Sequence, residues 1–590
     1  MSLAKNQLVE LTVIGVTGEG NGVARYIEEV VAVPGMVVFI PYTAVGDRIL
    51  CRIVKVHKSY AFGRVEELLD PSPDRTDVRD CGVFGRCGGC AWRHISYEAE
   101  CRYKYQWVSD TLHRVGGLEI ELLPLLAADA PDRYRNKAQF PVASGENGPV
   151  MGFFAPRSHR IAACRDCLLQ PAGFAAVLDA VDGWMRKNHV PAYDETTHKG
   201  LVRHIYIREG AVSGQMMVCL VCTSGKLPAV PALIEAVKDA APKLASLVVN
   251  INSARTNVIL GDGGYTLWGA DAIEDELCGL RFRLSPHSFY QVNHAQTQKL
   301  YALAAEAAAL TGRETLLDLY CGTGTIGLSM ASRAKQVIGV EVVSAAVEDA
   351  RRNAEVNGIT NARFICADAA QAAEQLACEG VRPDVIVIDP PRKGCDASLI
   401  DTVVAMAPAR VVYVSCDPAT LARDLKLFTE KGYAVKTVQP VDLFPRTAHC
   451  ETVALLSRQI VVHKMKLNSA AFEMIKSGEK TIELRLFDEK RQQVKVGDKI
   501  LFTNIANGET LNTTVVKLHR FNTFNELYKS LPLLKCGYTS ENVDKATPSD
   551  MEQYYSVEEQ RKYGVVGIEL CRPKQITDEN VVSLTRKHGE

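Results

Sequence analysis

The sequence predicts a chain of several domains, the most clearly marked of which is an α/β domain with a mostly parallel sheet. Three observations support this prediction. The 590 residues exceed the usual length of one domain. Between about residues 282 and 456, short apolar runs alternate with helical stretches, which is typical of βαβ units. Segments near both ends of the chain instead have the features of small β-barrels.

Composition describes an ordinary globular protein, with 47% hydrophobic and 23% charged residues. No apolar run approaches the length of a membrane span, and the N-terminal "MSLAKNQLVELTV" lacks the layout of a signal peptide. We therefore expect a cytoplasmic protein with no membrane-bound part. The formal net charge is -1, so any surface that binds nucleic acid must be local.

The first 68 residues predict a small antiparallel barrel. Apolar and polar residues alternate in "LVELTVIGV", "VVFIPY" and "DRILCRIVKV", and Gly, Pro and Asp separate these runs. The stretch "GEGNGVAR" and the later "VGDR" resemble a TRAM domain, an OB-like barrel that its family uses to hold RNA. The alternation by itself fits a barrel without a ligand equally well.

The next segment, residues 69–281, is marked by closely spaced cysteines. "CGVFGRCGGC" contains Cys81, Cys87 and Cys90, and "ACRDCLLQP" contains Cys164 and Cys167. Eighteen cysteines in a cytoplasmic chain are more typical of thiols and metal ligands than of a disulfide framework. Three thiolates within ten residues and a distant fourth suit a bound cluster. The spacing leaves structural zinc as an equal alternative.

The α/β segment carries the features of a nucleotide-cofactor site. Its first strand ends at Asp318 and is followed by a turn with Gly322 and Gly324, where glycine permits close backbone approach. The second strand ends at Glu341, an acid placed to bind a ribose. The loop "DLYCGTGT" is similar to the one that methyltransferases use for S-adenosylmethionine, and "VIDPP", with Asp389, ends the fourth strand.

The residues after the fourth and fifth strands indicate the reaction. Methyltransferases that act on exocyclic amino groups place an aromatic residue after (D/N)-P-P, but here Arg392 follows, which disfavours an amino target. C5 of uracil becomes nucleophilic once a thiolate adds to C6. Cys416 lies at the carboxyl end of a strand, where open α/β sheets bind ligands. We expect Pro418 to hold the turn and the following helix to stabilise a thiolate.

A base is also required, because C5 carries a proton that must leave after methyl transfer. "TAHCETVALL" places Glu451 directly before the last apolar strand. We expect an enclosed carboxylate there to have a raised pKa, which suits proton abstraction. Taken singly, Cys416 could equally be a packing thiol and Glu451 a surface acid. The cofactor loop and "DPPR" favour the catalytic interpretation of both.

With these motifs the chain resembles a known family. "SFYQVN", "LDLYCGTGTIGL", "GVE", "DPPRKG", "SCDPATLARD" and "HCET" occur in the order found in RNA uracil-5-methyltransferases, particularly their TRAM-bearing, iron-sulfur-containing 23S ribosomal RNA members. The resemblance spans about residues 8 to 457. It implies C5-methylation of uridine in RNA, most of all ribosomal RNA, by a monomeric enzyme. It also implies an S-adenosylmethionine site made of Gln291, Tyr320, Glu341 and Asp389.

The same resemblance implies roles for six further residues. Cys416 is the implied nucleophile and Glu451 the implied base. A [4Fe-4S] cluster is implied on Cys81, Cys87, Cys90 and Cys167, where Cys167 is preferred to Cys164 because "CLLQP" is similar to the family's segment after its fourth ligand. One departure is that "FPRTAHCE" places Cys450 between His449 and Glu451.

The last segment, 459–590, resembles an ASCH domain, a small RNA-associated β-barrel, through "GEKTIELR" and "YGVVGIEL". Some ASCH proteins hydrolyse acetylated cytidine with a Lys and a Thr. Here Lys480 matches, but Glu483 stands at the Thr position, so we expect an RNA-binding accessory. The complete fold class is thus an α/β Rossmann-like methyltransferase domain (282–458), an N-terminal OB-like TRAM β-barrel (1–68), a central α+β iron-sulfur domain (69–281) and a C-terminal ASCH-like β-barrel.

Two alternatives to the ribosomal RNA enzyme remain open. One is a uridine-5-methyltransferase that acts on the tRNA T-loop. The other is an RNA-binding assembly factor without catalysis, in which the two barrels are the working parts. The presence of both Cys416 and Glu451 argues against the second alternative. Methylation of a base within structured RNA requires that the base leave its stack.

Overall fold

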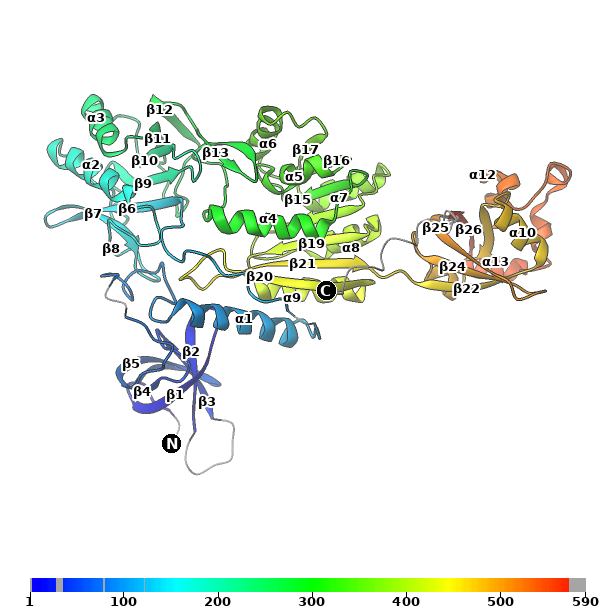
Figure 1. Cartoon of the computed structure of the whole chain (residues 1–590), viewed down its shortest axis with the longest axis horizontal. Helices are drawn as coiled ribbons and strands as arrows, with labels where there is room; N and C mark the ends of the chain where they lie inside the picture. The colour runs from blue at the N-terminus through cyan, green and yellow to red at the C-terminus, as the bar shows by residue number, and fades with distance from the viewer. Residues whose placement is uncertain (1–2, 28–34, 78–79, 121, 572–590) are drawn as a thin grey trace, which may run out of the picture. The chain divides into compact units, whose positions relative to one another are not determined.

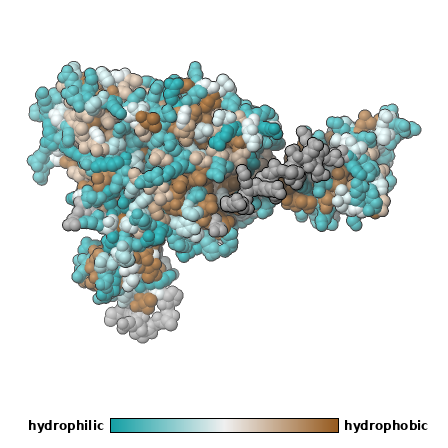
Figure 2. Space-filling view, in the orientation of Figure 1, coloured by the Kyte–Doolittle hydropathy of each residue, from teal (hydrophilic) through white to brown (hydrophobic). Residues whose placement is uncertain are grey.

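The computed structural model describes residues 3–27, 35–77, 80–120 and 122–571. Contacts divide the chain into two compact units, Met1–Ser457 and Arg458–Glu590. Figure 1 colours the first unit blue to yellow and the second orange to red. On the face shown in Figure 2, apolar residues form small patches within a mainly hydrophilic surface. Among the described residues, no helix is long and apolar enough to cross a membrane.

The first unit begins with a closed five-stranded barrel, which confirms the barrel predicted from the alternating pattern. Inward residues such as Val38, Ile49 and Ala61 are fully buried, and they alternate with more exposed neighbours. In the strand order β1-β2-β3-β5-β4, the bounds are β1 (Leu8–Val16), β2 (Asn21–Tyr26), β3 (Met36–Pro41), β5 (Tyr60–Asp70) and β4 (Arg48–Val56).

A long helix and a second sheet follow the barrel. Helix α1 (Tyr97–Arg114) begins at Ser96, whose side chain accepts a hydrogen bond from the N–H of Ala99. The sheet has the order β12-β11-β10-β9-β6-β7-β8 and packs against α2 (Gly173–Lys187) and α3 (Val230–Ala240). Its strands are β6 (Lys137–Gly145), β7 (Gly148–Phe154), β8 (Ile161–Ala163), β9 (Val202–Glu209), β10 (Met216–Cys222), β11 (Leu244–Ile251) and β12 (Gly263–Gly269).

The α/β part of the first unit contains a seven-stranded sheet in the order β17-β16-β15-β18-β19-β21-β20. The first five strands in this order are parallel, and β21 runs antiparallel to β19, so the predicted mostly parallel sheet is confirmed. The strands are β15 (Thr315–Leu319), β16 (Gln336–Glu341), β17 (Ala362–Cys366), β18 (Val385–Ile388), β19 (Arg410–Ser415), β20 (Tyr433–Val441) and β21 (Glu451–Arg458).

Helices cover both faces of this sheet, because its strands are apolar on both sides. In the view of Figure 1, α4 runs above β19 and α1 lies below β20 and α9. A hairpin of β13 (Ile273–Leu277) and β14 (Leu280–Leu284) precedes these helices, which are α4 (His294–Ala308), α5 (Thr325–Met330), α6 (Ser344–Val356), α7 (Ala369–Cys378), α8 (Ala397–Met406) and α9 (Pro418–Glu430).

The described part of the second unit, up to residue 571, differs from the predicted barrel, because its five strands form an open sheet in the order β22-β24-β25-β26-β23. Its apolar side chains form two cores, one with α10 (Ser469–Ser477) and one with α12 (Phe524–Ser530), whereas a barrel has a single interior. The other elements are β22 (Val462–Leu467), β23 (Ile482–Leu486), α11 (Glu489–Gln492), β24 (Lys499–Asn504), β25 (Thr510–Phe521), α13 (Val557–Tyr563) and β26 (Val565–Cys571).

Candidate active site

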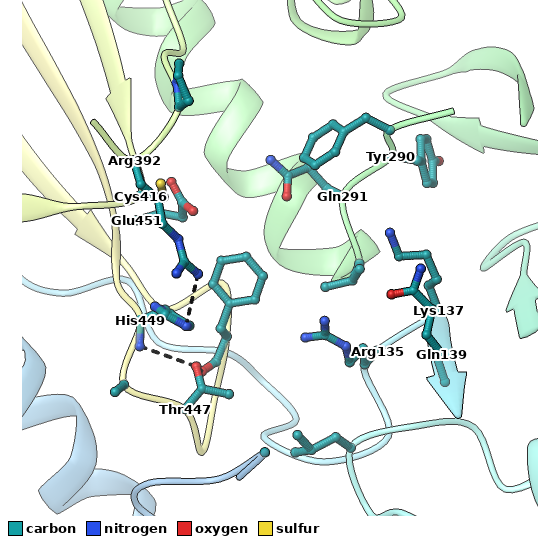
Figure 3. Close-up of a pocket in the computed structure, with 18 of the residues that line it drawn as sticks. Arg135, Lys137, Gln139, Tyr290, Gln291, Arg392, Cys416, Thr447, His449 and Glu451 are labelled. Carbon is teal, nitrogen blue, oxygen red and sulfur yellow. Dashed lines mark hydrogen bonds between the residues drawn. The ribbon is translucent and has the colours of Figure 1, made fainter. Parts of the chain in front are cut away.

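A cavity of about 1310 Å³ lies within the first unit and brings together residues from distant parts of the chain. The barrel contributes Tyr42, the cysteine-rich loop contributes Cys81 to Ala91, and β6 contributes Lys137. The remaining wall comes from the carboxyl ends of the strands of the α/β sheet, where such sheets bind ligands. Figure 3 shows part of this cavity. All ten predicted cofactor, catalytic and cluster residues line it: Cys81, Cys87, Cys90, Cys167, Gln291, Tyr320, Glu341, Asp389, Cys416 and Glu451.

The glycine-rich loop between β15 and α5 forms one end of the cavity. Gly322 and Gly324 have φ angles of 54° and 82°, so a side chain at either position would be strained. A Cβ on Gly324 would also lie 3.1 Å from Leu328. The N–H of Gly322 donates to Glu341 Oε2 at 3.1 Å, and the N–H of Val343 donates to Oε1 at 2.9 Å. These bonds fix the Glu341 carboxylate at the end of β16.

Two aspartates stand beside this loop, the buried Asp318 and the half-buried Asp389. Burial raises the pKa of Asp389 to about 7. The pKa of Asp318 is also raised to about 7, first by burial and then by the charges of Asp389 and Glu341, although a hydrogen bond from the N–H of Gly327 opposes the shift. Of these carboxylates Glu341 and Asp389 line the cavity, and together they favour a cationic ligand, because a nearby positive charge stabilises their ionised forms.

Cys416 and Glu451 are brought together by the register of β19 and β21. Ser415 pairs with Thr452 in this antiparallel ladder, so the next residue of β19 and the preceding residue of β21 face each other. The Thr452 hydroxyl also donates to the carbonyl oxygen of Ser415 at 3.2 Å. Figure 3 shows the Cys416 sulfur next to the Glu451 carboxylate.

The pKa values at this pair are both raised. Glu451 is 4% exposed, and burial, followed by the charge of Asp389, raises its pKa to about 8, as expected for an enclosed acid. The pKa of Cys416 is raised to about 11 by burial and then by Glu451 and Asp389. The expected stabilisation of the thiolate by α9 does not prevail, because Asp417 occupies the first N–H groups of that helix and burial disfavours the charge.

The positive charge of Arg392 acts on both members of this pair, because it lowers the pKa of Cys416 and of Glu451. Its Nη2 donates to His449 Nε2 at 3.3 Å. The pKa of His449 is lowered to about 4 by burial and then by Arg392, so its ring is neutral at pH 7 and accepts this bond. The backbone N–H of His449 in turn donates to the Thr447 hydroxyl at 3.3 Å (Figure 3).

The opposite wall was not predicted from the sequence. Lys137 and Gln139 project into the cavity from β6 (Figure 3). Arg135, two residues before this strand, projects into it as well. Burial, together with the charges of Arg208 and Arg135, lowers the pKa of Lys137 to about 8. The alternation of polar and apolar residues in "RNKAQF" was the available signal, but it does not show which cavity the polar side chains face.

The cysteines of the central segment converge at one side of the cavity, and Cys164 is present beside the four predicted ligands. The pKa of Cys90 is raised to about 12 by burial and then by neighbouring thiols, of which Cys167 acts most strongly. A hydrogen bond from Cys164 lowers the pKa of Cys167 to about 7. Among the described residues, no group of three His, Cys, Asp or Glu side chains is arranged to hold a metal ion.

A buried ion-pair network holds the loop that precedes β21. Lys104 of α1 is 1% exposed and donates to Glu100 Oε1 at 2.7 Å and to Asp442 Oδ1 at 2.8 Å. Its third acceptor is the carbonyl oxygen of Phe444 at 3.2 Å. The backbone N–H of Arg446, a residue with φ of 69°, donates to Glu100 Oε1 at 2.7 Å. Helix α1 therefore fixes the loop between Asp442 and Arg446.

Two other segments bind the same loop. The N–H groups of Ala91 and Trp92, which directly follow Cys90, both donate to the Arg446 carbonyl oxygen, at 2.8 and 3.2 Å. From the start of α4, the Asn293 amide donates to the Leu443 carbonyl oxygen at 3.0 Å. The loop is thus tied to the cysteine-rich segment, to α1 and to the segment that carries Gln291.

Comparison with protein families gives three matches along the chain. A tRNA (Uracil-5-)-methyltransferase model matches residues 270–459, a TRAM domain model matches residues 4–65, and an ASCH domain model matches residues 465–574. The first covers the α/β sheet and its cavity wall, and the second covers the closed barrel. The third covers nearly all of the open sheet and its helices.

Similar proteins span most of the first unit's length. An uncharacterised RNA methyltransferase of Halalkalibacterium halodurans is 46% identical over 77% of this chain and 97% of its own length. One from Listeria innocua is 43% identical over 77% of this chain and 98% of its own. A tRNA (uracil-54, C5)-methyltransferase of Pyrococcus abyssi, solved with S-adenosyl-L-homocysteine, superposes with a TM-score of 0.61 at 25% identity, covering 76% of this chain and 99% of its own.

An open α/β sheet with a glycine-rich cofactor loop, joined to a TRAM barrel, defines an RNA methyltransferase. The relatives and the family match narrow this class. The chain belongs to the family of S-adenosylmethionine-dependent RNA uracil-5-methyltransferases, as the sequence motifs indicated.

Proposed function

We propose that this enzyme methylates C5 of a uridine in 23S ribosomal RNA through a covalent adduct with Cys416. The observation that carries the proposal is the position of Cys416 directly opposite Glu451 at the cavity wall. A thiol and a carboxyl group placed this way can reach a flat ring held between them. The thiol can add to one carbon while the carboxylate accepts the proton of the neighbouring carbon.

The glycine-rich end of the cavity fits S-adenosylmethionine. The main-chain bonds to Glu341 hold its carboxylate in place for the ribose hydroxyls, and Asp389 is a half-buried acid whose pKa is raised to about 7 by burial. A sulfonium would stabilise the ionised form of such an acid. We assign Gln291, Tyr320, Glu341 and Asp389 to this site. When bound there, S-adenosylmethionine supplies the methyl group.

The residues of the chain divide the remaining steps between them. Cys416 gives its proton to solvent and its sulfur forms a bond to C6 of uracil, which places the electron pair of the C5–C6 double bond on C5. After C5 has accepted the methyl group, Glu451 removes the C5 proton. The electron pair then restores the double bond, the bond between C6 and sulfur breaks, and the thiolate is released. Arg392 favours the ionised forms of both residues.

Substitution at each end of the adduct tests this mechanism. We expect Glu451→Gln to add to the base and to transfer the methyl group but not to release the product, because the amide cannot accept the C5 proton. A protein–RNA band on denaturing gels, dependent on S-adenosylmethionine, is the expected result with a 23S rRNA transcript. Cys416→Ala is expected to form neither product nor band.

Two cavity and core thiols serve as matched controls. Cys321→Ala and Cys450→Ala are expected to retain the adduct in the Glu451→Gln background, since neither sulfur faces Glu451 across the strand pair. A band that survives in Cys416→Ala and disappears with either control would contradict the assignment of the nucleophile. Weak but normal turnover of Glu451→Gln without any band would show that Glu451 is not the base.

We further propose a [4Fe-4S] cluster on Cys81, Cys87, Cys90 and Cys167. Zinc would hold all its thiolates about 2.3 Å from a single ion. A cluster spreads its four ligands over four irons. The thiols share one cavity wall and affect each other's pKa, which supports a shared centre, and the resemblance to iron-sulfur enzymes favours the cluster over zinc. When bound, it would cross-link the loop 81–90 to the segment 164–167.

Metal analysis of protein purified without air tests the cluster. We expect iron and acid-labile sulfide in equal amounts, and we expect Cys87→Ser or Cys90→Ser to lose both and to lower the melting temperature. Cys378→Ser, which changes an exposed thiol on α7, is the matched control and is expected to retain them. Stoichiometric zinc without iron would contradict the proposal.

The choice of ribosomal RNA rests on the cysteine set, because the resemblance to the 23S enzymes includes those residues. Transfer RNA is the second candidate, favoured by the Pyrococcus abyssi tRNA enzyme that shares the fold. Methylation of both RNAs, purified from a strain that lacks the gene, separates the two. Tritiated methyl groups that appear in tRNA and not in 23S rRNA would favour the second candidate.

We propose four domains: 1–68, 69–281, 282–458 and 459–590. The last is proposed to be an accessory that binds RNA. In its "GEKTIELR" segment, Glu483 forms ion pairs with Lys480 at 2.8 Å and with Arg485 at 2.8 Å. A lysine engaged in an ion pair is a weak nucleophile, which supports binding over hydrolysis.

A further inference from the structure

Aromatic side chains gather on the outside of the N-terminal barrel. Side chains alternate between the two faces of a strand, and Val38 and Ala61 are fully buried in the barrel interior. Their neighbours on β3 and β5 therefore point outward. Together with a histidine from the turn before β5, these residues form what we call the aromatic patch: Phe39, His57, Tyr60 and Phe62.

The rings of the aromatic patch pack on one another. His57 stacks on Tyr60 with ring centroids 4.6 Å apart and an interplanar angle of 24°. Phe62 lies 5.6 Å from Tyr60 and 5.8 Å from Phe39. None of the four belongs to the hydrophobic core of the barrel, and all four are partly exposed. The patch is therefore a surface feature and adds no side chain to the barrel interior.

Basic residues border the patch on both sides. Phe62 lies opposite Lys55 of β4 and opposite Phe39 of β3. Across β3, the next strand is β2, which carries Arg25 on its exposed side. Lys58, in the turn before β5, is also exposed. In a chain with a net charge of -1, this local group of cations around aromatic rings is complementary to a polyanion with flat bases.

We propose that the aromatic patch is a second RNA-binding site, on which unpaired bases of the substrate RNA stack while Lys55, Lys58 and Arg25 contact phosphates. The inference rests on the proposed function, because it takes RNA as the substrate. No patch residue lines the cavity that holds Cys416. The bases bound here are therefore different nucleotides from the one that is methylated. They must be unpaired, because a duplex hides the faces of its bases.

Binding of short RNA to the full-length protein tests this site. The probes are a fluorescein-labelled 12-nucleotide oligouridine and a blunt RNA duplex of the same length. We expect Tyr60→Ala and Phe62→Ala to weaken oligouridine binding by about five- to a hundredfold each, with little change for the duplex. Tyr60→Phe and Phe62→Tyr keep a ring at each position and are expected to bind as the unaltered protein does.

Salt dependence separates stacking from phosphate contacts. Lys55→Gln and Lys58→Gln are each expected to reduce the slope of log Kd against log salt by about 0.7. The alanine variants at Tyr60 and Phe62 are expected to leave the slope unchanged. Tyr265→Ala, which removes an aromatic side chain 40% exposed on β12, is the matched control and should leave the affinity as it is.

Two results would overturn the proposal. One is normal oligouridine binding by both alanine variants, which would favour a protein partner for the patch. The other is an equal loss of oligouridine and duplex binding, which would show that the substitutions disturb the barrel as a whole. The adduct formed by Glu451→Gln is measured separately, so failure at the patch leaves the test of the proposed mechanism intact.

Discussion

At the scale of single residues, the two groups proposed to act on uracil lie where their neutral forms are favoured. Glu451 must be ionised to accept a proton, yet its pKa is raised to about 8. Cys416 must lose its proton, yet its pKa is raised to about 11. Both shifts come first from burial, so the enclosed positions of the two groups make each step depend strongly on pH.

This dependence gives a prediction. Release of the C5 proton from adduct that the unaltered enzyme has already formed, followed after a jump in pH, is expected to rise about tenfold per pH unit below pH 8 and to level off above it, as Glu451 ionises. Adduct formation by Glu451→Gln is expected to keep rising beyond pH 8, because only Cys416 then titrates. Single-turnover assays with tritium at C5 measure the first quantity, and gel bands measure the second.

A second substitution tests the electrostatic origin of these values. Arg392→Gln removes the cation that lowers the pKa of both residues, so its proton-release profile is expected to shift to higher pH. Arg392→Lys retains a charge and should shift less. An unchanged profile in Arg392→Gln would show that Arg392 does not influence Glu451.

The raised pKa of Glu451 also affects stability. A folded-state pKa near 8, above its unfolded value, makes a contribution that is complete below about pH 4.5 and is lost as the pH rises through 8. Glu451→Gln removes this titration. Its melting temperature is therefore expected to fall less than that of the unaltered protein between pH 7 and pH 9. An equal fall in both proteins, measured by calorimetry, would contradict this.

The motifs predicted two residues that the fold places side by side, but they did not predict what surrounds them. Cys416 and Glu451 were predicted from their places at the ends of two strands, and the register of β19 and β21 makes them neighbours. Lys137 was missed, because it comes from another sheet, about 280 positions before Cys416, and no local pattern connects the two. The raised thiol pKa was also missed, since burial is a property of the folded molecule.

At the scale of elements, helix α1 positions the loop that leads into β21. Substituting Lys104 by Met would leave Asp442 buried without its cation and Glu100 with only Arg446, 3.6 Å away, at a cost of about 3–5 kcal/mol in the free energy of unfolding. Because the loop ends at Glu451, we expect Lys104→Met to release its product slowly. The readout is an S-adenosylmethionine-dependent protein–RNA band like that of Glu451→Gln.

The control for this prediction is Lys299→Met, which removes a lysine of helix α4 that pairs with the exposed Asp129. It is expected to change stability by no more than about 0.5 kcal/mol and to give no band. A loss of stability in Lys104→Met without any band would show that the network stabilises the fold but does not position Glu451.

The pattern of the elements was predicted unevenly. The positions of strands such as β16 and β19 were predicted closely, because a short apolar run between two helical stretches can hold a strand in few places. The open sheet of the second unit was not, because closure depends on which strands pair at the edges, and alternation does not specify that. The ion pair between Lys104 and Asp442 could not be predicted, because the sequence around neither residue indicates that the two meet.

At the scale of the whole molecule, the chain divides after Ser457. All the proposed catalytic and cofactor residues precede this point, so a chain ending at Ser457 is expected to retain methyl transfer in single turnover. Its affinity for RNA is expected to fall, and the lost part should be sensitive to salt if phosphate contacts cause it. Loss of S-adenosylmethionine binding, measured by calorimetry, would show that the second unit supports the first.

The buried pairing of Lys104 with Asp442 joins positions 338 residues apart, and this has a consequence for synthesis. At about 5–20 residues per second, a ribosome needs roughly 17–70 s to make Asp442 after Lys104. During that interval the lysine has only Glu100 as a partner, so α1 cannot be buried in its final place. The N-terminal barrel can close early in synthesis. The methyltransferase pocket can be completed only after the ribosome has made Asp442.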